Sequence, residues 1–419
     1  MIGQLAHCSL KMKAIQFVQS IPRYVLSRAI STLYPPILWS RLSCLKYREV
    51  PEPPLPNEDW VKVKVRYGGI CGSDMGLIFL HNSPSLSAFV SFPFTVGHEN
   101  VGTIAELGSE VEGFEVGERV VVDPTLSCEV RGFADLCPAC RRGDTNLCQR
   151  FTEGAIAPGL LIGNCHDTGG SWSPLFAAHK SRLFRVPASV SDENGVMVEP
   201  FAVALHAVMR NFPRDDGVVL VMGAGVIGIF VVAALRALGS RARVIALAKY
   251  PFQEEMVQRY GADQVIYLAR GDGHYEELAQ ALGSTLHKPL LGKRVMVGGA
   301  DLVFDCVGSG GSIDDALRFT RSGGRMVLVG AAALPTGIEW TPIWLNEIEI
   351  KGSYIYGTEL YQGKRMRTFQ VALALMAEGV VDLAPLVTHK FKLEDYRRAL
   401  ASVPKKGRSG VIKAVFALD

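Results

Sequence analysis

Two different patterns of apolar and polar residues follow each other along the chain. Up to about Pro187, apolar residues alternate in short runs that glycine and proline interrupt, as in DWVKVKVRYGG, VGTIAELGSEV, GERVVVDP and SRLFRVP. A period of two predicts strands with one buried face, and their short spacing is typical of a loop-rich β-barrel. Residues 21–45 break this pattern because they are partly helical and contain a double proline, so we interpret them as an insertion.

After Asp215, continuous apolar runs alternate with helical segments; the runs are VVLVMG, RVIALA, QVIYL, DLVFDCVG and RMVLVG. Strands that are buried on both faces and separated by helices predict a doubly wound parallel sheet. A last strand ends near Gly352, and a helix and a closing strand, GVIKAVFAL, follow it. We therefore expect an α/β protein in which residues 1–204 form a β domain, residues 205–352 form a nucleotide-binding domain, and residues 353–419 return to the first.

Length and charge restrict the class of partner. A chain of 419 residues is too long for one ordinary core, which agrees with two domains. Its 44 basic and 41 acidic residues give a net charge of +3, so overall charge offers no strong case for nucleic acid or an anionic membrane surface. No secretory signal and no apolar stretch of membrane-spanning length is present. We expect a cytoplasmic protein whose partners are small molecules, with no nucleic acid and no membrane.

A glycine pattern at the start of the second region predicts a dinucleotide site. VLVMGAGVIG places Gly223, Gly225 and Gly228 directly after an apolar strand and at the opening of a helix that begins with Val226 and Ile227. Glycines at these positions allow a tight turn, a close backbone approach to a pyrophosphate and close packing of helix on strand. Two later strand ends, around Val307 in DCVGSGG and Gly330 in VLVG, fit a ligand contact or an ordinary turn equally well.

Four of the nine cysteines lie in one loop, CEVRGFADLCPACRRGDTNLC. An odd count with one tight cluster favours metal binding over a disulfide framework. Four thiolates complete a tetrahedral zinc with no open position, which is a structural site. The group is Cys128, Cys137, Cys140 and Cys148. For Cys128, the alternative to the role of fourth ligand is that of a buried cysteine in a long loop.

A second, mixed set of metal ligands lies at two glycine-rich bends. GGICGSDMG contributes Cys71, VGHENVG contributes His98 and Glu99, and VEPFAVALHAV contributes a further carboxylate, Glu199. A zinc held by about three mixed ligands keeps a position for water or substrate, which is the catalytic kind of site. A structural histidine and a buried cysteine are the alternative, but the neighbouring nucleotide and cysteine motifs favour the metal.

Taken in order, GGICGSD, GHE, the cysteine loop, VEPFAVALHAV and GAGVIG resemble the zinc-dependent medium-chain dehydrogenases of the alcohol dehydrogenase superfamily, in particular the threonine and sorbitol dehydrogenase branch. The resemblance spans the chain from about Met12. It implies a GroES-like β-barrel catalytic domain, a Rossmann domain, an active site in the cleft between them, two zinc ions per chain, and a homodimer or homotetramer.

The same resemblance implies roles for individual residues. Cys71, His98 and either Glu99 or Glu199 correspond to the ligands of the catalytic zinc. Ser73 corresponds to the hydroxyl that starts proton release, and Asp74 to the acid that orients the ligand histidine. Val203 corresponds to a residue that packs against the nicotinamide.

Three positions depart from the family pattern. Eight residues separate Cys128 from Cys137 where two are usual. Gly76 stands where a relay histidine often follows, so a proton leaves through water or another group. Ala248 stands where an acid commonly binds the ribose, and Lys249 follows it, so we expect NADP to be favoured over NAD.

We therefore expect a zinc-dependent oxidoreductase that transfers a hydride between a secondary alcohol or polyol, or its ketone, and a nicotinamide cofactor. Within the enzyme class, the alternative is a threonine-type amino-alcohol dehydrogenase. Outside it, the alternative is a non-catalytic nucleotide-binding relative that acts as a redox sensor. Metal content distinguishes the two classes, since an enzyme requires the open zinc as well as the structural one.

Overall fold

The computed structural model describes residues 10–268 and 271–418. The chain forms two compact units. The first comprises the chain up to Glu199 together with Leu383 onward, and the second comprises Pro200–Asp382. The division falls within helix α4 (Asp192–Met209). Within the described residues, none of the helices combines the length and apolar character needed to cross a membrane.

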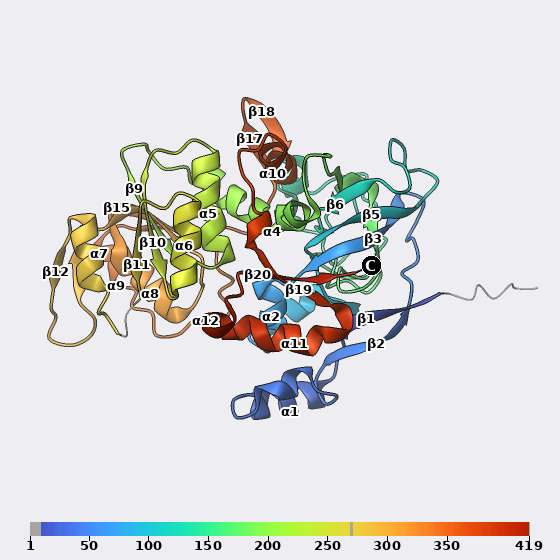
Figure 1. The fold of residues 1–419 in the computed structure, drawn as a ribbon, viewed down its shortest axis with the longest axis horizontal. Coiled ribbons are helices and arrows are strands. Elements are labelled where there is room, and N and C mark those ends of the chain that lie inside the picture. The colour runs from blue at the N-terminus through green and yellow to red at the C-terminus, as the bar shows by residue number, and fades with distance from the viewer. Residues whose placement is uncertain (1–9, 269–270, 419) are drawn as a thin grey trace, which may run out of the picture. The chain divides into compact units, whose positions relative to one another are not determined.

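The first unit is built on a seven-stranded sheet of order β19-β20-β3-β5-β6-β8, with β7 paired to β3 (Figure 1). Pairing is antiparallel except between β19 and β20. Val61, Val63 and Val65 of β3 are buried, while Lys64 between them is exposed, so the expected alternation is confirmed. The strands are β3 (Trp60–Gly69), β5 (Asn100–Leu107), β6 (Arg119–Val122), β7 (Leu175–His179), β8 (Leu183–Arg185), β19 (Val387–Lys392) and β20 (Lys413–Ala417).

A smaller sheet of order β2-β1-β4 completes this unit, from β1 (Lys11–Phe17), β2 (Leu45–Pro51) and β4 (Phe94–Thr95). Helix α1 (Ile21–Ser31) and the 3₁₀ helix η1 (Pro35–Trp39) lie between β1 and β2, which confirms a partly helical segment with a proline break. The other short helices are α2 (Gly72–Ile78), η2 (Pro84–Phe89), α3 (Pro138–Arg141), η3 (Thr145–Leu147), η4 (Lys180–Arg182), η5 (Ala384–Leu386), η6 (Leu393–Asp395), α11 (Tyr396–Ser402), η7 (Val403–Lys405) and α12 (Lys406–Ser409).

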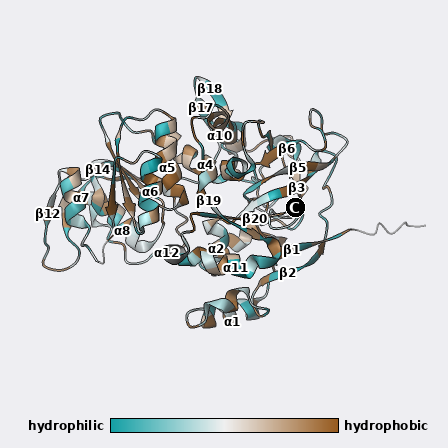
Figure 2. Ribbon diagram, in the orientation of Figure 1, coloured by the Kyte–Doolittle hydropathy of each residue, from teal (hydrophilic) through white to brown (hydrophobic). Residues whose placement is uncertain are grey.

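The second unit contains a six-stranded sheet of order β11-β10-β9-β14-β15-β16, in which every neighbouring pair is parallel. This confirms the predicted doubly wound sheet, and its central strands are brown, that is hydrophobic, in Figure 2. The strands are β9 (Val218–Met222), β10 (Arg243–Ala248), β11 (Gln264–Tyr267), β14 (Ala300–Asp305), β15 (Thr320–Leu328) and β16 (Glu349–Gly352). The helices between them are α5 (Val226–Ala237), α6 (Pro251–Arg259), α7 (Tyr275–Leu282), α8 (Gly310–Phe319) and α9 (Thr341–Leu345).

Three features of the second unit lie outside the predicted pattern. A hairpin of β12 (Thr285–His287) and β13 (Val295–Val297) precedes β14, and a second hairpin, β17 (Thr358–Tyr361) with β18 (Lys364–Arg367), follows β16. Helix α10 (Thr368–Ala377) comes after it. Chain connectivity thus places the two glycine-rich ligand bends and the cysteine loop in the first unit, and the nucleotide motif in the second.

Candidate active site and metal centres

Cys71, His98 and Glu99 form one group, with a ligand atom from each lying within 4.8 Å of the others. The register of the main sheet explains why they meet. Gly68 near the end of β3 pairs with Asn100 at the start of β5, so residues just after β3 and just before β5 share one end of the sheet. A thiol, an imidazole and a carboxylate gathered at this spacing are the donor set that zinc accepts.

Asp74 contacts both Cys71 and His98. Its side chain is buried; Oδ2 accepts a hydrogen bond from the Cys71 backbone N–H at 2.9 Å, and Oδ1 lies 3.5 Å from His98 Nδ1. Burial lowers the pKa of His98, but the charges of Asp74 and Cys71 outweigh it and raise this pKa well above its usual value. A carboxylate behind the ring selects which nitrogen faces a metal.

Glu99 is fully buried, and its carboxylate forms an ion pair with Lys413 of β20, which is also buried. Burial lowers the pKa of Lys413, and the Glu99 charge raises it above the usual value. Gly69 leaves the space for this carboxylate, because a Cβ there would lie 1.9 Å from Glu99 Oε2. Neither Gly69 nor Lys413 was predicted as part of this site; the only sign of Lys413 in the sequence is a single charge within the apolar strand GVIKAVF.

Ser73 and Glu199 are not members of the group formed by Cys71, His98 and Glu99. Ser73 is exposed on the first turn of α2, two residues after Cys71. Glu199 is buried on α4 and contributes to the electrostatic environment of Lys413, but it lies outside the group of ligand atoms that Cys71, His98 and Glu99 form.

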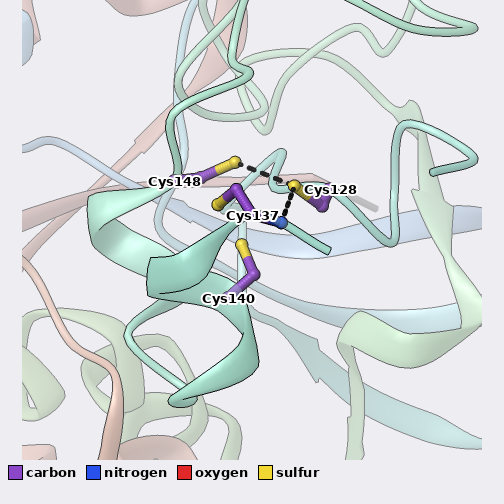
Figure 3. A group of neighbouring side chains, drawn as sticks. All are labelled: Cys128, Cys137, Cys140 and Cys148. Atoms are coloured by element: carbon purple, nitrogen blue, oxygen red, sulfur yellow. Dashed lines mark hydrogen bonds between the residues drawn. The ribbon is translucent and has the colours of Figure 1, made fainter. Parts of the chain in front are cut away.

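The four cysteines Cys128, Cys137, Cys140 and Cys148 are buried, and their sulfurs lie within 4.8 Å of one another (Figure 3). Cys128 Sγ lies 3.5 Å from Cys148 Sγ and accepts a hydrogen bond from the Cys137 N–H at 3.4 Å. Four thiolates on a zinc with bonds of about 2.3 Å stand about 3.8 Å apart, so this group fits that ion. Burial raises the pKa of Cys137, yet backbone N–H donors from Cys140 and Gln149 lower it to about 6.

Arg131 organises the backbone of the cysteine loop. Its guanidinium is buried and donates five hydrogen bonds to main-chain carbonyls, those of Leu126, Glu153, Ile156, Ala157 and Gly159, at 2.8, 2.8, 3.0, 3.2 and 2.8 Å. Burial lowers the pKa of this group. Arg131 could not be recognised from the sequence, because its acceptors are backbone carbonyls, which any residue provides. It ties segments on both sides of the cysteine group together.

The glycine motif forms the turn between β9 and α5. Gly223 has a φ of +92°, and a Cβ on Gly228 would lie 2.0 Å from the Gly223 carbonyl oxygen. Gly225 is the N-cap of α5, which starts with Val226 and Ile227. The turn therefore needs glycine at both ends, one for its backbone conformation and one for close packing.

Val307 and Gly330, from the ends of β14 and β15, lie at the same edge of the sheet as this turn. A Cβ on Gly223 would meet Val307 Cγ2 at 2.5 Å, and a Cβ on Gly330 would meet the Val307 carbonyl carbon at 2.4 Å. Buried Asp305 holds this loop by accepting the Val307 N–H at 2.9 Å. The carboxyl ends of parallel strands are where such sheets bind ligands.

Lys249 and Val203 are two further candidates for contact with the cofactor. Lys249 directly follows β10; its side chain is exposed and its Nζ lies 5.6 Å from the centre of the Tyr250 ring. The Ala224 N–H donates to the Leu247 carbonyl at 2.9 Å, which joins the end of β10 to the glycine turn. Val203 lies four residues after Glu199 on α4 and is half-buried.

Comparisons with known proteins agree with both motifs. Residues 57–188 match the family model "Alcohol dehydrogenase GroES-like domain", and residues 226–378 match "Zinc-binding dehydrogenase". The chain is 31% identical over 363 residues to L-idonate 5-dehydrogenase of Vitis vinifera, covering 85% of this chain and 88% of that one. It is 31% identical over 375 residues to L-threonine 3-dehydrogenase of Paraburkholderia xenovorans, covering 88% and 94%. The crystal structure of 2R,3R-butanediol dehydrogenase from Bacillus subtilis has a TM-score of 0.69, at 25% identity over 97% of this chain and 100% of that one.

Proposed function

This chain belongs to the zinc-dependent medium-chain dehydrogenases, in their threonine/sorbitol-like branch, and from that premise we propose that Cys71, His98 and a glutamate hold its catalytic zinc. It is an oxidoreductase that acts on alcohols with zinc and a nicotinamide cofactor. The observation that carries the proposal is a half-buried thiol, an imidazole and a fully buried carboxylate whose ligand atoms lie within 4.8 Å of one another. We take Glu99 as the third ligand because it belongs to that group, and Glu199 is the alternative.

Zinc bound there would supply a Lewis acid that lowers the pKa of a substrate hydroxyl toward neutrality. The chain's own residues do the rest. Asp74 holds His98 in one orientation through the 3.5 Å contact. Lys413 balances the charge of Glu99, so an anionic carboxylate is tolerated in a fully buried position. Ser73, exposed two residues after Cys71, takes up the hydroxyl proton and passes it to water, since Gly76 offers no side chain for a relay.

The glycine turn would bind the pyrophosphate of the cofactor at the N-terminus of α5, where unpaired backbone N–H groups and the helix dipole favour an anion. Val307 and Gly330 border the same edge, and we propose that they contact the cofactor, with Val203 against the nicotinamide ring. Hydride transfer then belongs to the cofactor, and the protein sets its position.

Lys249 supports a preference for NADP. Ala248 provides no acid to bind a free 2′-hydroxyl or to repel a 2′-phosphate, and the exposed ammonium of Lys249 stands next to it. A charge-assisted contact to phosphate is worth about 1.5–3 kcal/mol, or about ten- to a hundred-fold in affinity. We expect Lys249→Ala to lower kcat/KM for NADP by about that factor and to leave the value for NAD unchanged. A wild-type preference for NAD would contradict the proposal.

The substrate we propose is a secondary alcohol or polyol, or the matching ketone. The support is that the relatives are named for idonate, threonine and butanediol, of which threonine keeps the amino-alcohol alternative open. A panel of these alcohols, monitored by nicotinamide absorbance, ranks them by kcat/KM. The redox-sensor alternative would give no turnover with any of them although the cofactor binds.

We propose that Cys128, Cys137, Cys140 and Cys148 hold a second zinc with a structural role. The four sulfurs are buried and close to the spacing of a tetrahedral site, and this supports a closed coordination shell. We therefore expect the purified chain to contain about two zinc ions. Cys71→Ser should remove the catalytic ion and leave the structural one bound.

We also propose that the chain forms a homodimer through the edge of the parallel sheet. β16 is the last strand of that sheet, and all four of its residues are exposed. An antiparallel pair of β16 strands centred on Ile350 would place Glu349 opposite Lys351 of the second copy. Ile350→Lys should shift the mass measured by analytical ultracentrifugation to that of a monomer. A dimer mass that is unchanged in Ile350→Lys would contradict an interface at β16.

A further inference from the structure

The outer face of α1 is apolar, which is unusual for a surface helix. Ile21 and Val25, one turn apart, are 75% and 59% exposed, and Leu33 just beyond the helix is 91% exposed. Tyr24, Leu26, Tyr34 and Leu42 are exposed as well. Within the helix, Ile21, Tyr24 and Val25 have the i, i+3, i+4 spacing of one face, and Leu33, Tyr34 and Leu42 add exposed apolar side chains just beyond it, so the segment presents an apolar surface to solvent.

The segment that carries this face is firmly anchored. Ile37 and Leu38 of η1 are buried in the core of the first unit, and η1 packs on α11. Arg28 Nη1 donates to the Leu80 carbonyl at 3.0 Å, and Arg23 Nη1 donates to the Arg41 carbonyl at 2.8 Å. The apolar face is therefore held in place as a platform.

Charge around the platform is one-sided. Seven of the 44 basic residues and none of the 41 acidic residues occur in the first 48 positions, so the remainder, with 37 against 41, has a formal charge of −4. Arg23 and Arg28 lie on α1, and Arg41 and Lys46 follow it in the chain; within residues 10–268 and 271–418, none of these four forms an ion pair with a carboxylate. Burial and the Arg23 charge lower the pKa of Lys46, as expected where cations gather.

A hollow of about 320 Å³ opens beside this segment. Arg41, Lys46 and Arg397 line it, with Glu394 as the one carboxylate among its lining residues. Lys46 Nζ, which lines the hollow, donates to the Arg41 carbonyl at 2.5 Å, and Arg23 of α1 donates to the same oxygen. One carbonyl therefore connects the wall of the hollow to the helix. The surface thus offers an apolar face next to a cationic recess.

We propose that α1 and its flanking cations dock this protein on an anionic phospholipid membrane, with the helix lying in the interface. Apolar side chains on one face and arginines at its borders are the pattern of an interfacial helix, and the recess accepts a lipid phosphate. The expectation of no membrane partner rested on the overall charge of +3, which conceals this local excess. A second copy fits the face poorly, because a two-fold contact would bring two acid-free, cationic segments together.

The test is co-sedimentation of the full chain with vesicles of phosphatidylcholine alone and of phosphatidylcholine with phosphatidylglycerol. We expect binding to the anionic vesicles only, and its release by high salt. Val25→Glu should weaken this binding at least about ten-fold, and Arg41→Gln about five-fold. Leu291→Glu is the matched control, since Leu291 is 90% exposed on the loop between β12 and β13, and it should leave binding unchanged.

Turnover with alcohol and the thermal midpoint report that each variant is folded, since none of these residues belongs to the proposed catalytic or cofactor sites. The proposal is overturned if anionic vesicles leave the protein in the supernatant, or if Val25→Glu binds like the wild type. It is also overturned if Leu291→Glu lowers binding as much as Val25→Glu. A lipid-free oligomer that dissociates in Val25→Glu, but not in Ile350→Lys, would identify a second copy as the occupant instead.

Discussion

Replacing Arg131 by lysine should destabilise the first unit although the charge is kept. The guanidinium donates to five carbonyl oxygens at 2.8–3.2 Å, whereas an ammonium has three donors on one nitrogen. At least two carbonyls therefore lose the hydrogen bond from this side chain, and within the described part of the chain only that of Ala157 has a second donor, the Cys165 thiol at 3.3 Å. Each buried, unpaired polar group costs about 1–3 kcal/mol, so for two such groups we expect a loss of about 4 kcal/mol in the free energy of unfolding.

For a unit of this size, about 4 kcal/mol corresponds to a fall of about 8–16 °C in the thermal midpoint. Differential scanning fluorimetry measures it, and a colorimetric chelator measures how fast the cysteine site releases zinc, which should be faster in Arg131→Lys. Arg150→Lys is the control, because Arg150 is half-buried, donates to a single carbonyl, that of Asp135, and otherwise lies over the Phe133 ring, a position that a lysine can also take; it should stay within about 1 kcal/mol of the wild type. An Arg131→Lys midpoint equal to that of the control would refute the role of the five hydrogen bonds.

Three further outcomes follow from the two proposed metal centres. Cys128→Ser should lower zinc content from about two to one per chain while Cys71 keeps its ion, measured by atomic absorption; unchanged content would exclude Cys128 as a ligand. Gly69→Ala places a Cβ 1.9 Å from Glu99 Oε2, so it should abolish turnover and leave the cysteine zinc bound; normal turnover would show that the carboxylate can move. Lys413→Met leaves Glu99 buried and unpaired, at a cost of about 3–5 kcal/mol in the zinc-free protein. Adding Glu99→Gln should recover most of that stability, and a double variant as unstable as the single one would contradict the pairing.

Local patterns sufficed to predict the second unit's sheet and the glycine turn. Continuous apolar strands, and the glycine at position 223 whose φ is +92°, can be recognised from residues that are adjacent in the sequence. The alternation of these strands with helices then predicts the parallel sheet. Cys71 and His98 could be predicted to lie together because each stands at a glycine-rich bend, which a strand interior does not require; their role as zinc ligands stays a prediction.

Contacts between distant residues could not be predicted in this way. Lys413 is 314 positions from Glu99, and only the pairing of β20 with β3 brings it to the site. The acceptors of Arg131 are backbone oxygens, which any residue provides. The periodicity of α1 predicts an amphipathic helix, yet Val25 faces outward and Ser27 inward, a choice made by the packing of η1 and α11 rather than by the helix itself.

Zinc-dependent turnover tests the central claim most directly. The purified chain is stripped of the catalytic ion with a chelator, and reduction of NADP by a panel of secondary alcohols is followed before and after zinc is restored. We expect turnover that disappears on stripping and returns with zinc, and that is absent in Cys71→Ser and His98→Ala although both still bind the cofactor. Turnover that persists in zinc-free protein, or in either variant, would contradict the account.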